Sequence, residues 1–377
     1  MATNKTDKVL NVPTLRFPGF TGEWQILTLG KICDTFEYGM NVPAKEYDGE
    51  NRYIRITDID DCSHLYSLLN EVSPDGNLED KYLVKEGDIL FARTGASVGK
   101  SYIYRSSDGK LYFAGFLIRA HVRCEYNPFF VFYQTLTSKY SKWVNIMSAR
   151  SGQPGINSQE YASYQLSVPP MNEQKKLADF LSLLDERIAL QSKLIDRLKS
   201  LMGGIIDKVT ARTPNISIGE CLDCYSSTLQ ECETEEQGTY PVYGANGVCG
   251  YLDYATISAP AILIVKDGSG VGNVSYANGD CSVVGTLNYM QPKKDVSAKF
   301  LYFVLKRFNF QPYKTGMAIP HIYFKAYSKA RIFCPDYEEQ TRMAATLSRI
   351  EDKIALEERL LCLLQEQKHY LLSAMFI

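Results

Sequence analysis

Apolar residues recur at alternating intervals of three and four along two long stretches of the chain that contain no proline. Between residues 171 and 210 these positions are Leu177, Leu181, Leu184, Ile188, Gln191, Ile195, Leu198, Met202, Ile205 and Val209. Between residues 337 and 376 they are Met343, Leu347, Ile350, Ile354, Glu357, Leu361, Leu364, Lys368, Leu371 and Met375. This spacing is typical of a helix that buries one narrow face against another helix. The pattern therefore predicts two long helices of the coiled-coil type.

The two helical stretches are copies of each other and align without a gap. Glu173-Gln174 matches Glu339-Gln340, and Ile188 matches Ile354 within a longer shared motif. One polar site recurs in both seams: it is Gln191 in the first and Glu357 in the second. A polar residue in such a seam usually fixes the register of a helix pair. We therefore expect the two helices to pack together in one defined alignment.

The regions that precede the two helices echo each other more faintly. Residues 88–99 and 261–272 both contain an apolar strand, a glycine loop and a Val-Gly pair. Gly115 pairs with Gly285 in the same order along the chain. Self-similarity at a fixed order indicates duplication. The repeated unit is therefore a mixed domain of strands and helices followed by one long helix.

Composition and charge narrow the class of protein. The chain has 377 residues, 45% hydrophobic composition, 41 Lys and Arg, and 43 Asp and Glu, which gives a net charge of -2. Such a chain is long enough for two or three domains. No apolar run approaches the length of a membrane-spanning helix, and the first residues contain no apolar core of a secretory signal. We therefore expect a cytoplasmic protein without a membrane segment.

The cysteines and the glycine loop suggest two cofactor sites that the spacing does not support. Ten cysteines scattered along the chain indicate reduced thiols, and Cys221, Cys224, Cys232 and Cys249 lack the paired spacing of a zinc site. Gly95 to Lys100 resembles a nucleotide-binding phosphate loop, but three residues instead of four separate its glycines. We expect no metal and no cofactor in this chain.

No group of residues indicates catalysis. The Asn127-Pro128 pair and the following phenylalanines resemble a methyltransferase signature that lacks its second proline, and a helix N-cap explains them better. The four histidines stand beside no nucleophile pattern. A surface loop explains the dense carboxylates better than a nuclease metal site; they are Asp58, Asp60 and Asp61. The chain is therefore predicted not to be an enzyme.

Basic residues gather near aromatic residues in both domains. In the first domain they are Arg93, Lys100, Arg105, Lys139, Lys142 and Arg150, around Tyr102, Tyr104, Tyr140 and Trp143. In the second domain they are Lys306, Arg307, Lys314, His321, Lys325 and Lys329. Basic residues beside polar loop residues are typical of phosphate positioning combined with reading of base edges. A solvated protein surface is the alternative explanation for them.

The order of these features resembles the specificity subunits of type I restriction-modification enzymes, over nearly the full chain. The resemblance rests on the opening residues 12–20, the strand 86–90 with its glycine loop, the entry 168–174 into the first helix, and the second copy of this layout. It implies an α+β fold with two mixed target recognition domains and an antiparallel coiled coil, as a pseudo-two-fold repeat. The implied domains are 1–170 (recognition domain 1), 171–213 (first helix), 214–335 (recognition domain 2) and 336–377 (second helix).

The resemblance also implies a function and partners. Each recognition domain would read one half of a bipartite, asymmetric site in double-stranded DNA, while the helices set the spacing and dock two modification subunits. Those methyltransferase subunits would use S-adenosylmethionine, and restriction subunits would cleave DNA with ATP and Mg, so this chain would hold no cofactor. Two alternatives stay open: a coiled-coil scaffold without DNA binding, and a specificity subunit of a related methyltransferase without ATP-driven cleavage.

Candidate contact residues follow from the loops and the seam. For DNA in the first domain they are Arg93, Thr94, Ser97, Lys100, Arg150, Ser151, Gln153 and Asn157. For DNA in the second domain they are Lys266, Ser269, Asn273, Lys314, Thr315, His321 and Lys325. For the helix pair and subunit interface they are Leu177, Leu181, Leu184, Ile188, Ile195, Leu198, Leu347, Ile350, Ile354, Leu361 and Leu364. A structural role in a turn is the alternative for each loop residue.

Overall fold

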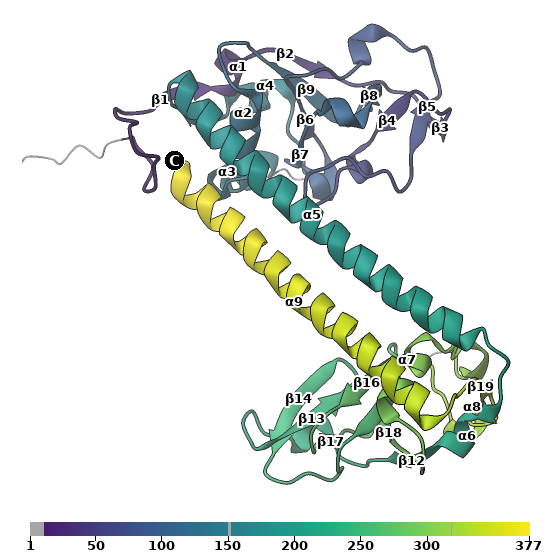
Figure 1. Ribbon diagram of the computed structural model, residues 1–377. Coiled ribbons are helices and arrows are strands. Elements are labelled where there is room, and N and C mark those ends of the chain that lie inside the picture. The colour runs from purple at the N-terminus through teal and green to yellow at the C-terminus, as the bar shows by residue number, and fades with distance from the viewer. Residues whose placement is uncertain (1–10, 150–151, 318) are drawn as a thin grey trace, which may run out of the picture. The chain divides into compact units, whose positions relative to one another are not determined.

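The structure is a computed structural model, and it describes residues 11–149, 152–317 and 319–377. It divides into two compact units, each of which contains one mixed domain and a part of both long helices (Figure 1). The first unit comprises residues 1–191 and 360–377, and the second comprises residues 192–359. Each mixed domain therefore belongs to one unit together with a segment of both long helices.

A four-stranded antiparallel sheet forms the centre of the first unit, in the order β2-β9-β6-β7. Its strands are β2 (Cys33–Tyr38), β9 (Leu117–Val122), β6 (Asp88–Ala92) and β7 (Ser101–Ile103). All five residues of β6 are buried, because this central strand is covered on both faces. Shorter strands pair around it: β1 (Gln25–Thr28) with β10 (Gln165–Val168), β3 (Ala44–Glu46) with β5 (Val72–Pro74), and β4 (Arg52–Ile54) with β8 (Leu111–Phe113).

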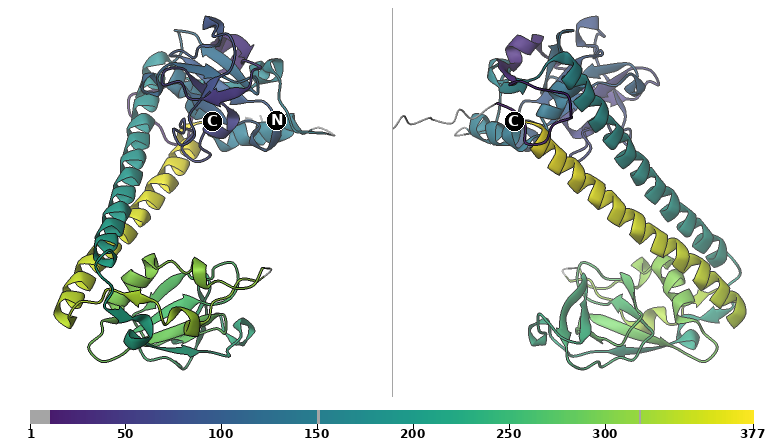
Figure 2. Two further views of the ribbon diagram at one scale, coloured as in Figure 1. Left: turned by 90° about the vertical axis from the view of Figure 1, so that its right-hand side faces the viewer. Right: turned by 60° about the vertical axis from the view of Figure 1, so that its left-hand side comes forward.

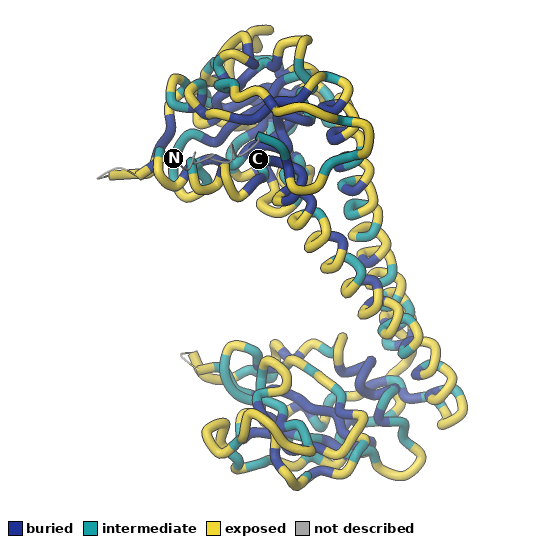
Figure 3. The backbone as a smooth tube through the Cα atoms, turned by 90° about the vertical axis from the view of Figure 1, so that its left-hand side faces the viewer, coloured by how far each residue is buried: buried dark blue, intermediate teal, exposed yellow. Residues whose placement is uncertain are grey.

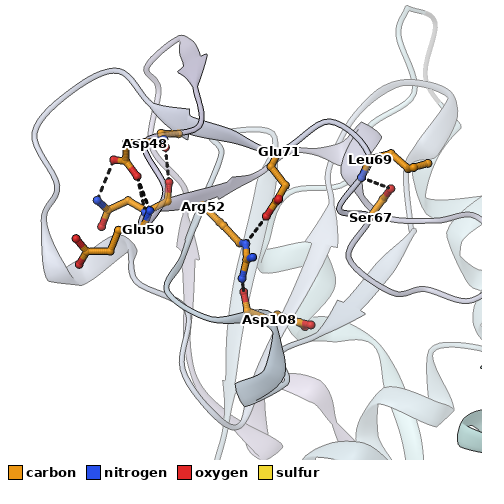
Figure 4. A network of polar contacts seen from close by, with 9 residues as sticks. Asp48, Glu50, Arg52, Ser67, Leu69, Glu71 and Asp108 are labelled. Carbon is orange, nitrogen blue, oxygen red and sulfur yellow. Dashed lines mark hydrogen bonds and ion pairs between the residues drawn. The ribbon is translucent and has the colours of Figure 1, made fainter.

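Polar contacts hold the loops around β4 in place (Figure 4). Arg52 Nε donates to the Glu71 carboxylate, and Arg52 Nη1 donates to the carbonyl oxygen of Asp108 at 2.8 Å. Asp48 accepts hydrogen bonds from the backbone N–H groups of Glu50 and Asn51 at 2.9 and 2.7 Å. Asn51 Nδ2 also donates to Asp48 Oδ2 at 2.9 Å, and this bond, together with the two backbone bonds, holds the pKa of Asp48 below its usual value.

Short helices and one long helix complete the first unit. They are α1 (Leu29–Ile32), α2 (Pro128–Gln134), α3 (Ser138–Ser148), α4 (Ser158–Ser163) and α5 (Met171–Thr210), of which α5 continues into the second unit. The Asn127 side chain accepts a hydrogen bond from Phe130 N at 2.9 Å, which confirms that the Asn-Pro sequence caps a helix. The last residues of the chain lie against the same unit (Figure 2), where Leu15 N donates to the Ala374 carbonyl at 2.9 Å.

The second unit repeats the strand order of the first, with a central antiparallel sheet β12-β18-β15-β16. Its strands are β12 (Leu222–Ser226), β18 (Leu287–Pro292), β15 (Ala261–Val265) and β16 (Val274–Ala277). A second sheet contains β14 (Gly247–Leu252), β13 (Tyr240–Gly244) and β17 (Ser282–Val283), and β11 (Ile216–Ser217) pairs with β19 (Arg331–Ile332). The helices are α6 (Ile218–Cys221), α7 (Ala298–Arg307), α8 (Phe324–Tyr327) and α9 (Tyr337–Met375), of which α9 continues into the first unit.

The helices α5 and α9 pack on each other inside each unit. In the first unit Leu177 and Leu181 share a core with Leu371 and Met375. In the second unit the Lys199 ammonium lies 2.6 Å from the Glu358 carboxylate, and the guanidinium of Arg212, just after the end of α5, lies 3.0 Å from Glu339. Residue numbers rise along α5 while they fall along α9, so the pair is antiparallel, as the resemblance implies.

Buried and exposed positions alternate along both long helices (Figure 3). Every seam position that the heptad pattern predicts is buried or half-buried, including the polar Gln191 and Glu357. None of the helices in residues 11–149, 152–317 and 319–377 combines the length and the apolar character that a bilayer crossing requires. In the same parts of the chain, no three His, Cys, Asp or Glu side chains converge as metal ligands would.

Candidate nucleic-acid interface

The glycine loop of the first unit connects β6 to β7 and returns tightly. Ala92 N donates to the Lys100 carbonyl at 2.8 Å, and Gly99 N donates to the Ala92 carbonyl at 3.0 Å. Gly99 has φ of 86°, and a Cβ there would lie 2.5 Å from a methyl carbon of Val144. Both the backbone conformation and the close packing require glycine at this position.

Three backbone hydrogen bonds join this loop to two other segments. Gly95 N donates to the Pro154 carbonyl at 3.0 Å, and Ile156 N donates to the Arg93 carbonyl at 2.9 Å. Arg93 N in turn donates to the Phe116 carbonyl at 3.0 Å. The sequence separates these residues by up to 63 positions, but the fold brings them together. We call the three segments the first loop cluster: residues 93–100, 114–117 and 152–157.

The second unit contains the same arrangement. Gly268 N donates to the Pro320 carbonyl at 3.0 Å, and Ile322 N donates to the Lys266 carbonyl at 2.9 Å. Lys266 N donates to the Thr286 carbonyl at 2.9 Å. Each bond has its counterpart in the first unit, so the duplication extends to the loops themselves. The second loop cluster consists of residues 266–273, 284–287, 315–317 and 319–322.

Arg93 is the cation at the centre of the first loop cluster. Its guanidinium carbon lies 5.0 Å from the centroid of the Tyr38 ring, and its Nε is buried without a hydrogen-bond partner. Burial raises the pKa of Tyr38, but hydrogen bonds with Ser158 and the charge of Arg93 outweigh this effect and lower it. An arginine whose planar guanidinium stacks on an aromatic ring is held in one orientation and is suited to an incoming acceptor.

Two predicted contact residues of the first domain have structural partners. Lys100 Nζ donates to the Ile59 carbonyl at 3.0 Å and pairs with the Asp61 carboxylate, so its side chain is only 11% exposed. Asn157 forms a capping box with Glu160: its side chain accepts from Glu160 N at 2.9 Å. Both residues hold their loops in shape, and this leaves them little freedom to reach a ligand.

The structure places the other predicted loop residues as follows. Thr94, Ser97 and Gln153 belong to the first loop cluster, while Arg150 and Ser151 lie outside the described residues. In the second loop cluster Thr315 and His321 exchange backbone hydrogen bonds of 2.9 and 2.8 Å and close a narrow loop. The remaining residues lie in or next to that cluster: Lys266, Ser269 and Asn273 on the glycine loop, Lys314 before Thr315, and Lys325 on α8.

Several residues of the predicted basic groups form ion pairs or hydrogen bonds with the long helices or with the end of the chain. Lys306 Nζ lies 3.0 Å from the Glu351 carboxylate on α9, and the Arg307 guanidinium lies 2.6 Å from Asp207 on α5. Lys139 Nζ donates to the Ile377 carbonyl at 3.0 Å. Fewer of these cations are therefore available to a ligand than the sequence suggests, because side chains that are close in sequence point toward different partners.

Two residues of the clusters, Phe116 and Thr286, were not predicted from the sequence, nor was Tyr38, which stacks on Arg93. Phe116 is 59% exposed at the tip of the turn that joins β8 to β9, and Thr286 occupies the same position before β18. The pairing of Gly115 with Gly285 marks this turn in both copies. The residue that follows this glycine is Phe116 in one copy and Thr286 in the other. A comparison of the two copies that looks for identical residues therefore does not find it.

The two long helices also expose apolar residues on a face away from their seam. On α5, Leu183, Leu190 and Leu201 are 64%, 66% and 53% exposed. On α9, Leu356, Leu363 and Tyr370 follow one another at intervals of seven and are 62%, 53% and 63% exposed. Apolar side chains that recur at this spacing lie along one face of a helix. Such a face is suited to packing against another protein.

A protein-family model for the type I restriction modification DNA specificity domain matches residues 21–200 and 218–366. The two matches together cover most of the chain, once for each copy of the repeat. The chain belongs to this family. The match accounts for the duplicated strand order and for the matched loop clusters.

Individual specificity subunits show the same relationship. A protein named "Putative type I restriction enzyme MjaX specificity subunit", from Methanocaldococcus jannaschii, is 26% identical over 195 residues. That alignment covers 50% of this chain and 45% of the relative, so the similarity spans less than half of the relative's length. The crystal structure of a type I S subunit from M. genitalium matches with a TM-score of 0.71 at 16% identity, over 97% of this chain and 99% of that one.

A second solved chain has a TM-score of 0.52 at 17% identity and covers 96% of this chain and 98% of that one. The structure that contains it is described as showing the basis of complex assembly and conformational transition of the type I restriction-modification system. At these identities the similarity establishes the fold: two mixed domains and two long helices.

Proposed function

We propose that this chain is the DNA-reading subunit of a type I restriction-modification system in the cytoplasm. Each loop cluster reads one half of a bipartite DNA site, the first through residues 93–100, 114–117 and 152–157. The observation that supports this most is the recurrence of three loops joined by the same three hydrogen bonds in both units. The turns in these clusters differ, Phe116 against Thr286, as two unlike half-sites require.

The chemistry of the clusters supports contact with DNA. Arg93 and Lys266 occupy equivalent positions, and each supplies a positive charge that attracts phosphate or the acceptor edge of guanine. The neighbouring residues Gln153, Ser269 and Asn273 carry amide or hydroxyl groups that pair with base edges or the backbone. The other predicted residues, Thr94, Ser97, Thr315 and His321, form the turns that hold them.

The long helices serve as the spacer and as the docking site for partners. α5 has 40 residues, which corresponds to about 60 Å at ~1.5 Å per residue. The exposed residues Leu183, Leu190 and Leu201 on its outer face would pack on modification subunits. Those subunits would supply the methyl transfer with S-adenosylmethionine, and restriction subunits would supply ATP- and Mg-dependent cleavage. This chain would contribute recognition and no reacting group.

Single substitutions in equivalent positions test this proposal. We expect Arg93→Ala and Lys266→Ala each to weaken methylation of the site by about tenfold in the complex assembled with the modification subunit. Because the two residues belong to different domains, the relaxed base pairs should fall in opposite halves of the methylated motif. Sequencing of host DNA for N6-methyladenine measures this. Unchanged motifs in both variants would contradict the proposal.

A further inference from the structure

A pocket of about 570 Å³ borders the second loop cluster, and we propose that it binds the edge of a base that carries an exocyclic amino group, adenine or cytosine. This inference rests on the proposed function, since it assigns a base contact within the half-site that the second domain reads. Three segments form the walls of the pocket: residues 228–231, residues 244–249 at the tip of the β13–β14 hairpin, and residues 284–286.

The pocket shares a wall with the candidate DNA surface. Thr286 lines it, and the carbonyl of Thr286 accepts the hydrogen bond from Lys266 N. Gly285 N donates to the Leu229 carbonyl at 2.8 Å and thereby fixes the opposite wall. In the first unit the exposed Phe116 occupies the position of Thr286. The lining residue Thr286 therefore differs from its counterpart at a point where the backbones of the two domains correspond.

The charges of the lining exclude the DNA backbone as its ligand. No Lys or Arg is among the described residues that line the pocket, and Glu231 contributes a carboxylate, which would repel a phosphate group. Apolar side chains of Leu229, Val248 and Val284 form part of the wall. An apolar pocket with a few polar groups is typical of sites that hold a flat organic group in one orientation.

The polar groups indicate which base edges fit. In the major groove cytosine presents its N4 amino group and adenine its N6 amino group beside N7, whereas guanine and thymine present O6 and O4. The Glu231 carboxylate accepts from an amino group and repels a carbonyl oxygen. The Asn246 amide can both donate and accept, as adenine requires. Within the described residues neither of these two side chains has a hydrogen-bond partner or an ion pair.

The test uses the full chain assembled with its modification subunit in cells, followed by sequencing of host DNA for N6-methyladenine. We compare the wild-type chain with Glu231→Gln and Asn246→Ala. Glu236→Gln is the matched control, because Glu236 is exposed in the same segment and does not line the pocket. Arg93→Ala marks the half-site of the first domain. Thermal unfolding verifies that each variant is folded.

We expect Glu231→Gln and Asn246→Ala each to relax the preference for adenine or cytosine at one base pair by about tenfold. That base pair should lie in the half-site that Arg93→Ala leaves unchanged, and Glu236→Gln should behave as the wild type. If the wild type methylates a bipartite motif while both pocket variants keep its preferences, or relax the same half as Arg93→Ala, the pocket assignment is wrong. If the wild type methylates no bipartite motif, the proposed function itself fails.

Discussion

At the scale of single residues, two buried glutamines show the duplication most clearly, because they make the same contacts in both copies. Gln174 Oε1 accepts from Asn127 N at 2.9 Å, and Gln174 Nε2 donates to the Pro169 carbonyl at 2.9 Å. Gln340 makes the same two bonds to Ser297 N and the Pro335 carbonyl, at 2.8 and 2.9 Å. Each glutamine therefore joins the start of a long helix to the cap of a short one and to the strand end before it.

Replacement of such a glutamine should be costly, because it leaves buried backbone groups without partners. We expect Gln174→Ala to lower the free energy of unfolding of the first unit by about 2 kcal/mol. Urea denaturation followed by circular dichroism measures this loss. Gln159→Ala, at an exposed position of the same domain, is the control and should have no effect. An equal midpoint for the two variants would show that the bonds of Gln174 contribute nothing.

Lys100 and Arg93 should respond in opposite ways to substitution, although both are cations of one loop. Lys100→Ala removes the contacts to Ile59 and Asp61 and should lower stability by about 1 kcal/mol. Arg93→Ala should leave stability unchanged and weaken DNA binding of the assembled enzyme at several salt concentrations. Thermal melts and binding titrations separate the two effects. If Lys100→Ala weakens DNA binding and leaves stability unchanged, Lys100 contacts DNA and the structural role assigned to it is wrong.

The sequence alone predicts the repeat, the fold class and the cap at Asn127, because each depends on local pattern. It does not predict which cations stay free. Lys306 is committed to Glu351, and Lys100 to Asp61, by contacts between residues far apart in the chain. Tyr38 lies 55 residues before Arg93, and only the sheet brings their side chains together. The DNA contacts themselves remain predictions.

At the scale of elements, Glu351 fastens α7 to α9 in the second unit. Burial raises the pKa of its carboxyl, but hydrogen bonds from Tyr302, Lys306 and Lys299 outweigh that effect, and the net pKa lies below its usual value. The same position in the first copy is Asp185, which accepts from Tyr133 at 2.9 Å and pairs with Lys368 at 2.6 Å. Both copies thus fix a short helix to a long one through an acidic residue.

This arrangement predicts a dependence of stability on pH. Because the folded-state pKa of Glu351 is depressed, its contribution is present above the unfolded-state pKa of about 4.3 and is lost as pH falls through the folded value. We expect Glu351→Gln to destabilise the second unit at pH 7 and to make less difference at lower pH. Thermal unfolding between pH 7 and pH 3 measures both variants. A constant difference over that range would contradict the account.

Substitutions on the exposed and on the buried face of α5 should have different effects. Leu190 is 66% exposed and Leu184 is 8% exposed, so the two leucines differ mainly in what covers them. Leu190→Glu should leave the chain folded and prevent its assembly with the modification subunit, as measured by light scattering. Leu184→Asp buries a charge in the core and should cost about 4 kcal/mol or more. If the Leu190 variant still assembles with the modification subunit, the exposed face of α5 is not the docking surface.

At the scale of the whole molecule, the chain is two versions of one unit in which strand order, caps and loop contacts recur. The differences lie at the places that a ligand could reach: an exposed Phe116 in one unit, and Thr286 beside a pocket in the other. A duplicated frame with unlike loops is suited to an asymmetric bipartite site.

The most direct test is to express the chain together with its modification subunit and to sequence the host DNA for N6-methyladenine. The account predicts a methylated motif in two unlike halves with a fixed spacer, which appears only when both proteins are present. A stable complex that leaves the DNA unmethylated would contradict the claim that the two loop clusters read DNA.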